Sequence, residues 1–224
     1  MRTSTTHLRD LAGPVRTDAA VVIDVMRAFT VAPWCLARGA SAVYLAADVE
    51  SAVAGRTRWP DALLLKDGDP DHRFDLPNAP GVVQCADLHG RTIVQVTGNG
   101  TRGAHAVADV ELVLCASFVT AHATARALRD ADVAAVTFVV TEGDEDRAFA
   151  DYLTAIISGD IVEATPYLRR AAASPAADEL RRRGDDPHHG GVHPEDAGLC
   201  LELDRFDFSL NTQPDGEFLR LVTC

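Results

Sequence analysis

The chain has 224 residues and a formal net charge of −12 at pH 7, with 47% hydrophobic and 24% charged residues. This composition is typical of a soluble globular protein, and the length suits one domain with a sizeable core. The acidic balance argues against non-specific nucleic-acid binding, which needs a basic surface. A site for a small anion would need a local concentration of positive charge.

The sequence predicts a cytoplasmic protein. Its five cysteines include no C-x-x-C pair, which favours reduced thiols. Residues 1–16 are polar and lack the apolar core of a secretory signal. No apolar run approaches the roughly 18 residues that cross a membrane.

Apolar runs alternate with helical patterns through the first two thirds of the chain. Strands are expected at residues 19–24, 42–45, 62–65, 92–96, 112–115 and 133–140, and helices at 32–39, 48–57, 101–108, 118–129 and 144–158. Asp48 is expected to cap the second helix. The alternation predicts an α/β layered fold, with a mainly parallel sheet and helices on both faces.

The pattern changes after Gly159. Helices are expected at 164–173, 175–183 and 195–203, a loop at 184–194, and short strands at 206–210 and 218–222 around the turn Asp215-Gly216. Ser174 and Pro175 are typical of a helix start. We therefore expect a single α/β domain over residues 1–224, with a core at about 19–158 and a helical and β-hairpin addition at about 159–224.

Polar residues follow five of the predicted strands. They are Asp24 and Arg27, then Lys66 with Asp67 and Asp69, the turn Thr97–Thr101, Ser117, and the run Thr141–Asp144. In an open parallel sheet, ligands bind beyond the carboxyl ends of the strands. Carboxylates hold Mg²⁺, whereas arginine, lysine and backbone amides hold an oxyanion. The set therefore predicts a metal-assisted phosphate site.

The stretch Gly98-Asn99-Gly100-Thr101-Arg102-Gly103 joins a strand to a helix. Such a turn presents backbone N–H groups and a helix N-terminus to an anion, although glycines also serve simple tight turns. Its letters match the dinucleotide motif G-x-G-x-x-G, but the next strand ends Cys115-Ala116-Ser117 without the required acid. The turn also lacks the lysine of a P-loop. Dinucleotide-dependent redox chemistry is therefore a less favoured alternative.

Three further features leave their interpretation open. Lys66 is the one lysine beside 20 arginines, and it is either required as lysine or incidental. The loop with His188, His189 and His193 carries metal-binding residue types, but its glycine, proline and acid content favours a solvated loop. Ser117 has histidines nearby in the sequence, but no nucleophile elbow surrounds it.

Four segments together resemble the 2-phosphosulfolactate phosphatase family, the Mg²⁺-dependent phosphatases of coenzyme M biosynthesis. Its D-V-L-R-A-T-T motif corresponds to Asp24–Thr30, its N-S-P to Asn78–Pro80 and its T-T-N-G-T to Thr97–Thr101. A G-S-x-x-N-A-like stretch corresponds to Ala116–Ala121. The resemblance covers roughly residues 19–158, with a fainter echo at 194–210.

The resemblance implies an enzyme that hydrolyses a small anionic phosphomonoester with Mg²⁺. The candidate catalytic residues are Asp24, Arg27, Lys66, Asp67 and Asp69; the candidate phosphate-binding or substrate-binding residues are Arg27, Asn78, Thr97, Gly98, Asn99, Gly100, Thr101 and Ser117; the candidate metal ligands are Asp24 and Asp151. A homodimer is expected from the base rate for cytosolic α/β enzymes.

The chain also departs from the family's motifs at three places. The family's G-E after the third strand reads Lys66-Asp67-Gly68-Asp69, its E-D reads Ala150-Asp151, and the serine of N-S-P is Ala79. At least one expected carboxylate is therefore missing, and Lys66 brings a positive charge beside it. A non-catalytic anion-binding protein on the same fold stays open as the alternative.

Overall fold

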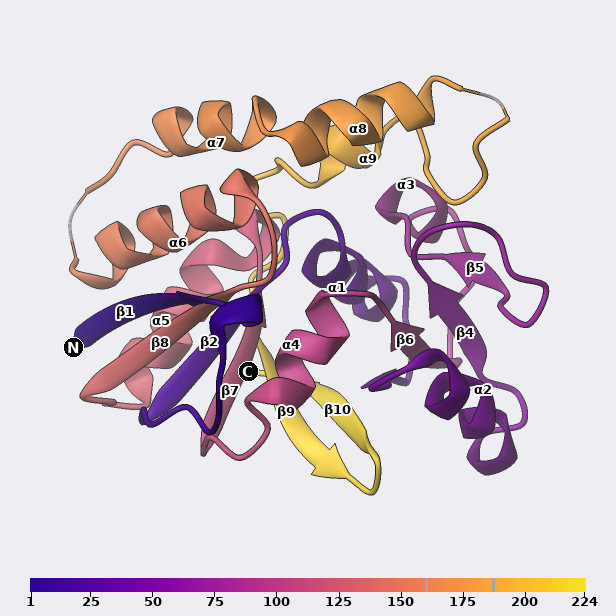
Figure 1. The fold of residues 1–224 in the computed structure, drawn as a ribbon, viewed down its shortest axis with the longest axis horizontal. Helices are drawn as coiled ribbons and strands as arrows, with labels where there is room; N and C mark the ends of the chain where they lie inside the picture. Colours follow the sequence, from indigo (N-terminus) through magenta and orange to yellow (C-terminus); the bar gives the residue numbers. More distant parts are fainter. Residues whose placement is uncertain (160, 187) are drawn as a thin grey trace.

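The computed structural model describes residues 1–159, 161–186 and 188–224. Within them, ten strands form one sheet in the order β1-β8-β2-β7-β9-β10-β3-β6-β4-β5 (Figure 1). The strands are β1 (Arg2–His7), β2 (Ala19–Ile23), β3 (Ala42–Leu45), β4 (Leu63–Lys66), β5 (Leu76–Pro77), β6 (Thr92–Val96), β7 (Leu112–Ala116), β8 (Ala135–Val140), β9 (Leu210–Asp215) and β10 (Phe218–Thr223). The helices are α1 (Ala28–Ala37), α2 (Val49–Arg58), α3 (Pro80–Val83), α4 (Gly100–Ala106), α5 (Ala121–Asp130), α6 (Asp144–Ile157), α7 (Thr165–Ala172), α8 (Pro175–Gly184) and α9 (Asp196–Leu199).

The sheet consists of two parallel groups joined by an antiparallel hairpin. One group is β1-β8-β2-β7 and the other is β3-β6-β4-β5. The hairpin β9-β10 lies between them and pairs antiparallel with β7 on one side and with β3 on the other. The α/β class with a mostly parallel sheet is confirmed. The C-terminal strands, however, lie in the middle of the sheet, where they connect its two parallel groups (Figure 1).

Helix α1 is the centre around which both groups pack. Eight of its ten residues are buried, which suits its almost wholly apolar sequence. Its core cluster joins Val22 and Cys115 of the first group to Val43 and Ile93 of the second. Helix α4 packs on the same face (Figure 1). Because the two groups meet on one helix, polar residues from both can reach a common point beside its N-terminus.

The other face of the sheet is covered by separate helices over each group. Helices α5, α6 and α7 bury the side chains of β2, β7 and β8 that point away from α1. Helix α2 and Trp59 cover the corresponding side chains of β3, β4 and β6. Helices on both faces are therefore confirmed. None of the helices in the described residues is long and apolar enough to cross a membrane.

Most expected elements are present, and the caps are confirmed. Asp48 accepts a hydrogen bond from the Ser51 amide at the start of α2, and Ser174 accepts one from Ala177 at the start of α8. Helix α1 begins four residues before the predicted start, because the Asp24 carboxylate accepts the Ala28 amide at 2.9 Å. Pro187 of the predicted loop 184–194 lies outside the described residues.

Two predictions near the C-terminus are wrong. The helix expected at 195–203 spans only Asp196–Leu199, and the strand expected at 206–210 begins at Leu210 instead. The two-residue turn at Gly216, whose φ is +67°, pairs Asp215 with Phe218 and so fixes the strand register. Strand β1 was not expected, because its half-exposed polar sequence has no apolar run.

Candidate functional site

One cavity of about 700 Å³ lies beyond the carboxyl ends of β2, β4, β6 and β8. The sequence-predicted residues that line it are Asp24, Arg27, Asp67, Asn78, Thr97, Asn99 and the run 141–144. Helix α8 supplies the remaining wall through Glu179, Leu180 and Arg183. The structure therefore brings together predicted residues that come from both parallel groups.

Asp24 follows β2 directly and is only 6% exposed. Its Oδ1 accepts the Ala28 amide, which fixes the carboxylate against the start of α1. A Cβ on Gly100 would lie 2.6 Å from Asp24 Oδ2, so a side chain at that position would clash. Gly100 is thus needed for the close approach of α4 to the carboxylate.

The glycine-rich turn uses several of its polar groups within the protein. The Gly98 amide donates to Asp67 Oδ2 at 2.9 Å, and the Thr101 amide donates to Thr97 Oγ1 at 3.1 Å. The Asn99 side-chain amide donates to Glu142. Thr101 is fully buried and does not line the cavity. The turn therefore links the ends of β4, β6 and β8, and fewer of its amides face the cavity than the sequence predicts.

Arg27 is held from the C-terminal part of the chain. Its side chain is 7% exposed, and Nη1 donates to Asp196 Oδ2 at 2.6 Å and to the Gly191 carbonyl at 2.9 Å. Asp196 is fully buried and also accepts the amides of Gly81 and His193, each at 2.9 Å. Sequence reasoning missed Asp196, although the faint family echo at 194–210 covers it. One carboxylate thus ties the arginine, α3 and the 191–196 segment together.

Seven carboxylates line the cavity, and five of them follow β2, β4 and β8 closely: Asp24, Asp67, Glu142, Glu145 and Asp146. Burial, reinforced by the charges of Asp67, Glu145 and Glu142, raises the pKa of Asp24 to about 7 against the hydrogen bond from Ala28. Burial and the charges of Asp24 and Glu145 raise the pKa of Asp146 well above its usual range. Burial also raises the pKa of Glu145. These three carboxyl groups therefore release their protons at a higher pH than isolated carboxyl groups do.

Stability should depend on pH through Asp24. A carboxylate whose pKa is higher in the folded than in the unfolded state stabilises the fold at low pH, and that contribution is lost as pH rises through the folded value, here about 7. In EDTA, we expect the wild-type melting temperature to fall relative to that of Asp24→Asn between pH 5 and pH 8. Melting temperatures are measured by calorimetry. If those of the wild type and Asp24→Asn change equally with pH across this range, the raised pKa of Asp24 is contradicted.

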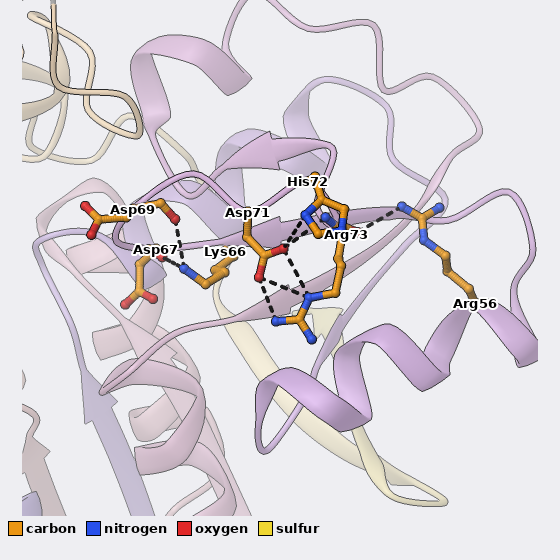
Figure 2. Close-up of polar contacts among 7 residues, drawn as sticks. All are labelled: Arg56, Lys66, Asp67, Asp69, Asp71, His72 and Arg73. Carbon is orange, nitrogen blue, oxygen red and sulfur yellow. Dashed lines mark hydrogen bonds and ion pairs between the residues drawn. The ribbon is translucent and has the colours of Figure 1, made fainter.

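Lys66 lies outside this cavity and holds the loop that follows β4. Its Nζ donates to the carbonyls of Asp67 and Asp69, at 2.8 and 3.0 Å (Figure 2). The Asp69 side chain is 89% exposed, with Arg183 as its ion-pair partner at 3.4 Å. In the same loop, Asp71 pairs with Arg73 (Figure 2). Of this acidic loop, Asp67 is the member that the structure directs toward the cavity.

Two other predicted residues lie away from the cavity. Ser117 is fully buried, and its Oγ bonds Thr30 Oγ1 and the Phe29 carbonyl, each at 3.0 Å. Asp151 is on the outer face of α6, where it pairs with Arg170 at 2.6 Å. Asp144 lies two turns earlier on that face and pairs with the same arginine. The adjacent face of α6 carries Glu145 and Asp146, which line the cavity and which were not among the predicted site residues.

Replacement of Asp151 by asparagine should leave the Mg²⁺-dependent phosphate release that the sequence resemblance implies unchanged within about twofold, since an exposed ion pair contributes little. Initial rates of phosphate release over a Mg²⁺ titration measure this. If the Mg²⁺ concentration for half-maximal activity differs between the variant and the wild type, Asp151 is a metal ligand.

The chemistry of the cavity, more than its geometry, fits a magnesium ion. Carboxylate oxygens are the ligands that Mg²⁺ prefers, and the buried Glu145 Oε2 has no hydrogen-bond partner in the part of the chain described. Across the same residues, no three His, Cys, Asp or Glu side chains converge closely enough to form a metal site by themselves. Mg²⁺ commonly uses one or two carboxylates and completes its shell with water and phosphate.

The fold and this cavity define an α/β protein with an acid-rich site beside a buried arginine. The chain belongs to the 2-phosphosulpholactate phosphatase family, whose model matches residues 7–187. A relative from Parasynechococcus marenigrum is 37% identical over 89% of this chain and 90% of its own. One from Bacillus subtilis is 28% identical over 89% of each chain, and one from Thermus thermophilus is 40% identical over 61% of this chain and 57% of its own. Each is named as a probable 2-phosphosulfolactate phosphatase.

Proposed function

We propose that this protein is a phosphoric monoester hydrolase for 2-phosphosulfolactate or a closely similar small anionic phosphomonoester. Family membership and the names of the relatives support the reaction class. The observation that carries the proposal is the position of Asp24, a buried carboxylate with a pKa raised to about 7 at the junction of both parallel groups. Perturbed carboxylates in a cavity are typical of catalytic sites.

The charge balance of the cavity supports a role for Mg²⁺. Its lining carries seven acids against two arginines, and Arg27 already faces Asp196. A phosphomonoester dianion would be repelled by this lining unless a cation offset the charge. Asp24 and Glu145 would hold the ion. When bound, Mg²⁺ polarises phosphoryl oxygens and lowers the pKa of a coordinated water.

The remaining cavity residues would bind and orient the substrate. The remaining donors of the Arg27 guanidinium and the amide group of Asn78, both in the cavity lining, would donate hydrogen bonds to phosphate or sulfonate oxygens. Asp146 accepts the amides of Val25, Thr141 and Glu142, and thereby holds the ends of β2 and β8 together. Its role is to keep the two strand ends in register with the site.

A phosphate-release assay over a panel of phosphomonoesters, including 2-phosphosulfolactate, tests the reaction. We expect release with Mg²⁺, loss of activity in EDTA and recovery on return of Mg²⁺. No release from any member of the panel would remove the catalytic proposal.

A non-catalytic anion-binding protein is the second candidate, favoured by the absence of a three-ligand metal cluster among the described residues and by Ala150 in the motif. Thermal shift with phosphate or sulfonate separates the two. Stabilisation by the anion alone, with no further effect of Mg²⁺, favours binding without catalysis. Stabilisation by NAD(P) would instead favour the redox alternative.

The acidic charge of the chain also bears on its location and partners. We propose a cytoplasmic homodimer that acts on a small molecule, with no nucleic-acid partner, from the acidic charge and the base rate for such enzymes. Light scattering of the purified protein measures the oligomeric state.

A further inference from the structure

Gln95 is a polar residue in an otherwise apolar stretch of β6. It is fully buried, in the sequence Ile93-Val94-Gln95-Val96. Its Oε1 has no hydrogen-bond partner among the described residues. A buried amide with an unpaired oxygen is unfavourable compared with an apolar side chain of similar size. Stability therefore does not explain a glutamine at this position.

The partners of Gln95 explain it better. Its Nε2 donates to the Ala28 carbonyl at 3.0 Å and to Asn78 Oδ1 at 2.7 Å. A backbone carbonyl can only accept, so the Gln95 amide must turn its NH₂ group toward Ala28. Both hydrogens of that group are then used, one for each partner.

This arrangement determines the orientation of Asn78. Since Gln95 presents a donor, Asn78 must present Oδ1 to it and keep its own NH₂ group for another acceptor. Asn78 is 1% exposed and lines the cavity together with Asp24 and Arg27. In the reversed orientation, two NH₂ groups would face each other in a buried space.

We propose that Gln95 is a positioning residue, which fixes the amide of Asn78 so that Nδ2 donates to an anionic oxygen of the substrate. The inference rests on the proposed function, since it assumes that a phosphate or sulfonate group enters this cavity. The Ala28 carbonyl determines the orientation of the Gln95 amide, and the Gln95 amide in turn determines the orientation of the Asn78 amide. Ala28 adjoins Arg27, so the same piece of backbone places the guanidinium and orients the amide.

Replacement of Gln95 by leucine tests the role, because it removes both donors at similar volume. We expect kcat/KM for the phosphomonoester to fall about tenfold, with a matching rise in the Ki of inorganic phosphate. Asn78→Ala should have a similar effect. If Gln95 acts through Asn78, the double variant should be no weaker than Asn78→Ala alone.

The matched control is Val94→Ala, the buried neighbour on the opposite face of β6. It should lower the melting temperature without changing the Ki of phosphate, whereas Gln95→Leu should raise that Ki and also lower the melting temperature, because it leaves Asn78 Oδ1 buried without its donor. Additive effects in the double variant, or a Ki of phosphate that Gln95→Leu leaves unchanged, would each overturn the inference.

Direct binding of inorganic phosphate, measured by calorimetry with Mg²⁺ present, separates this inference from the proposed function. If the wild type releases no phosphate from any substrate but binds the anion, the coupling between Gln95 and Asn78 is still read from the binding constants. If the wild type does not bind phosphate at all, the proposed function and this inference both fail.

Discussion

Asp24→Asn should abolish phosphate release, with a loss of roughly 10³-fold or more, and should stabilise the metal-free protein at pH 8. Asparagine keeps the shape of the side chain and an oxygen that accepts the Ala28 amide. It removes the charge that burial opposes and that Asp67, Glu145 and Glu142 repel. With a pKa shift from about 4 to about 7, the gain is on the order of 4 kcal/mol as an upper limit.

The two effects are measured on one preparation, by phosphate release with Mg²⁺ and by thermal unfolding in EDTA. Asp151→Asn is the matched control, because it changes the same chemical group at an exposed position outside the cavity. An Asp24→Asn enzyme that retained a tenth of the wild-type rate would show that this carboxylate is not central to the reaction. An unchanged melting temperature at pH 8 would show that the Asp24 charge does not destabilise the folded protein.

The second large effect is expected at Asp196. Asp196→Ala leaves the guanidinium of Arg27 buried without its partner, and removes the acceptor of the Gly81 and His193 amides. Loss of one member of a buried ion pair costs about 3–5 kcal/mol. For a chain of this size, the melting temperature should fall by roughly 10 °C. Asp178→Ala, which breaks an exposed pair on α8, should cost less than about 1 kcal/mol.

A double variant separates stability from function at this pair. Arg27→Met combined with Asp196→Leu replaces both charges by apolar side chains, which should recover much of the stability lost in Asp196→Ala. Activity should remain absent, because the guanidinium that binds the anion is gone. Phosphate release and thermal unfolding of the three variants measure this. Recovery of activity in the double variant would remove Arg27 from the site.

The local sequence predicts much of the sheet correctly. Strands β3 and β6 have the predicted bounds, and β2 and β7 differ by one residue, because short and mostly apolar runs leave few alternatives. The glycine turn was also recognised. Its glycine at position 100, however, is required by the approach of Asp24, a contact between segments far apart in sequence.

The missed features depend on tertiary partners. Asp196 pairs with an arginine 169 positions earlier, and Gln95 acquires its role only beside Asn78 and Ala28. The face of α6 that meets the cavity depends on how the helix packs, so the sequence could not separate Asp151 from Glu145. The hairpin's place between β7 and β3 is likewise a non-local pairing that a C-terminal pattern does not contain.

We propose that the acid-rich cavity at Asp24 is the site of a Mg²⁺-dependent phosphomonoesterase. The most direct measurement is the release of inorganic phosphate from 2-phosphosulfolactate by wild-type and Asp24→Asn protein, each with Mg²⁺ and with EDTA. We expect rapid release only for the wild type with Mg²⁺. Equal release by both proteins, or release that persists in EDTA, would contradict it.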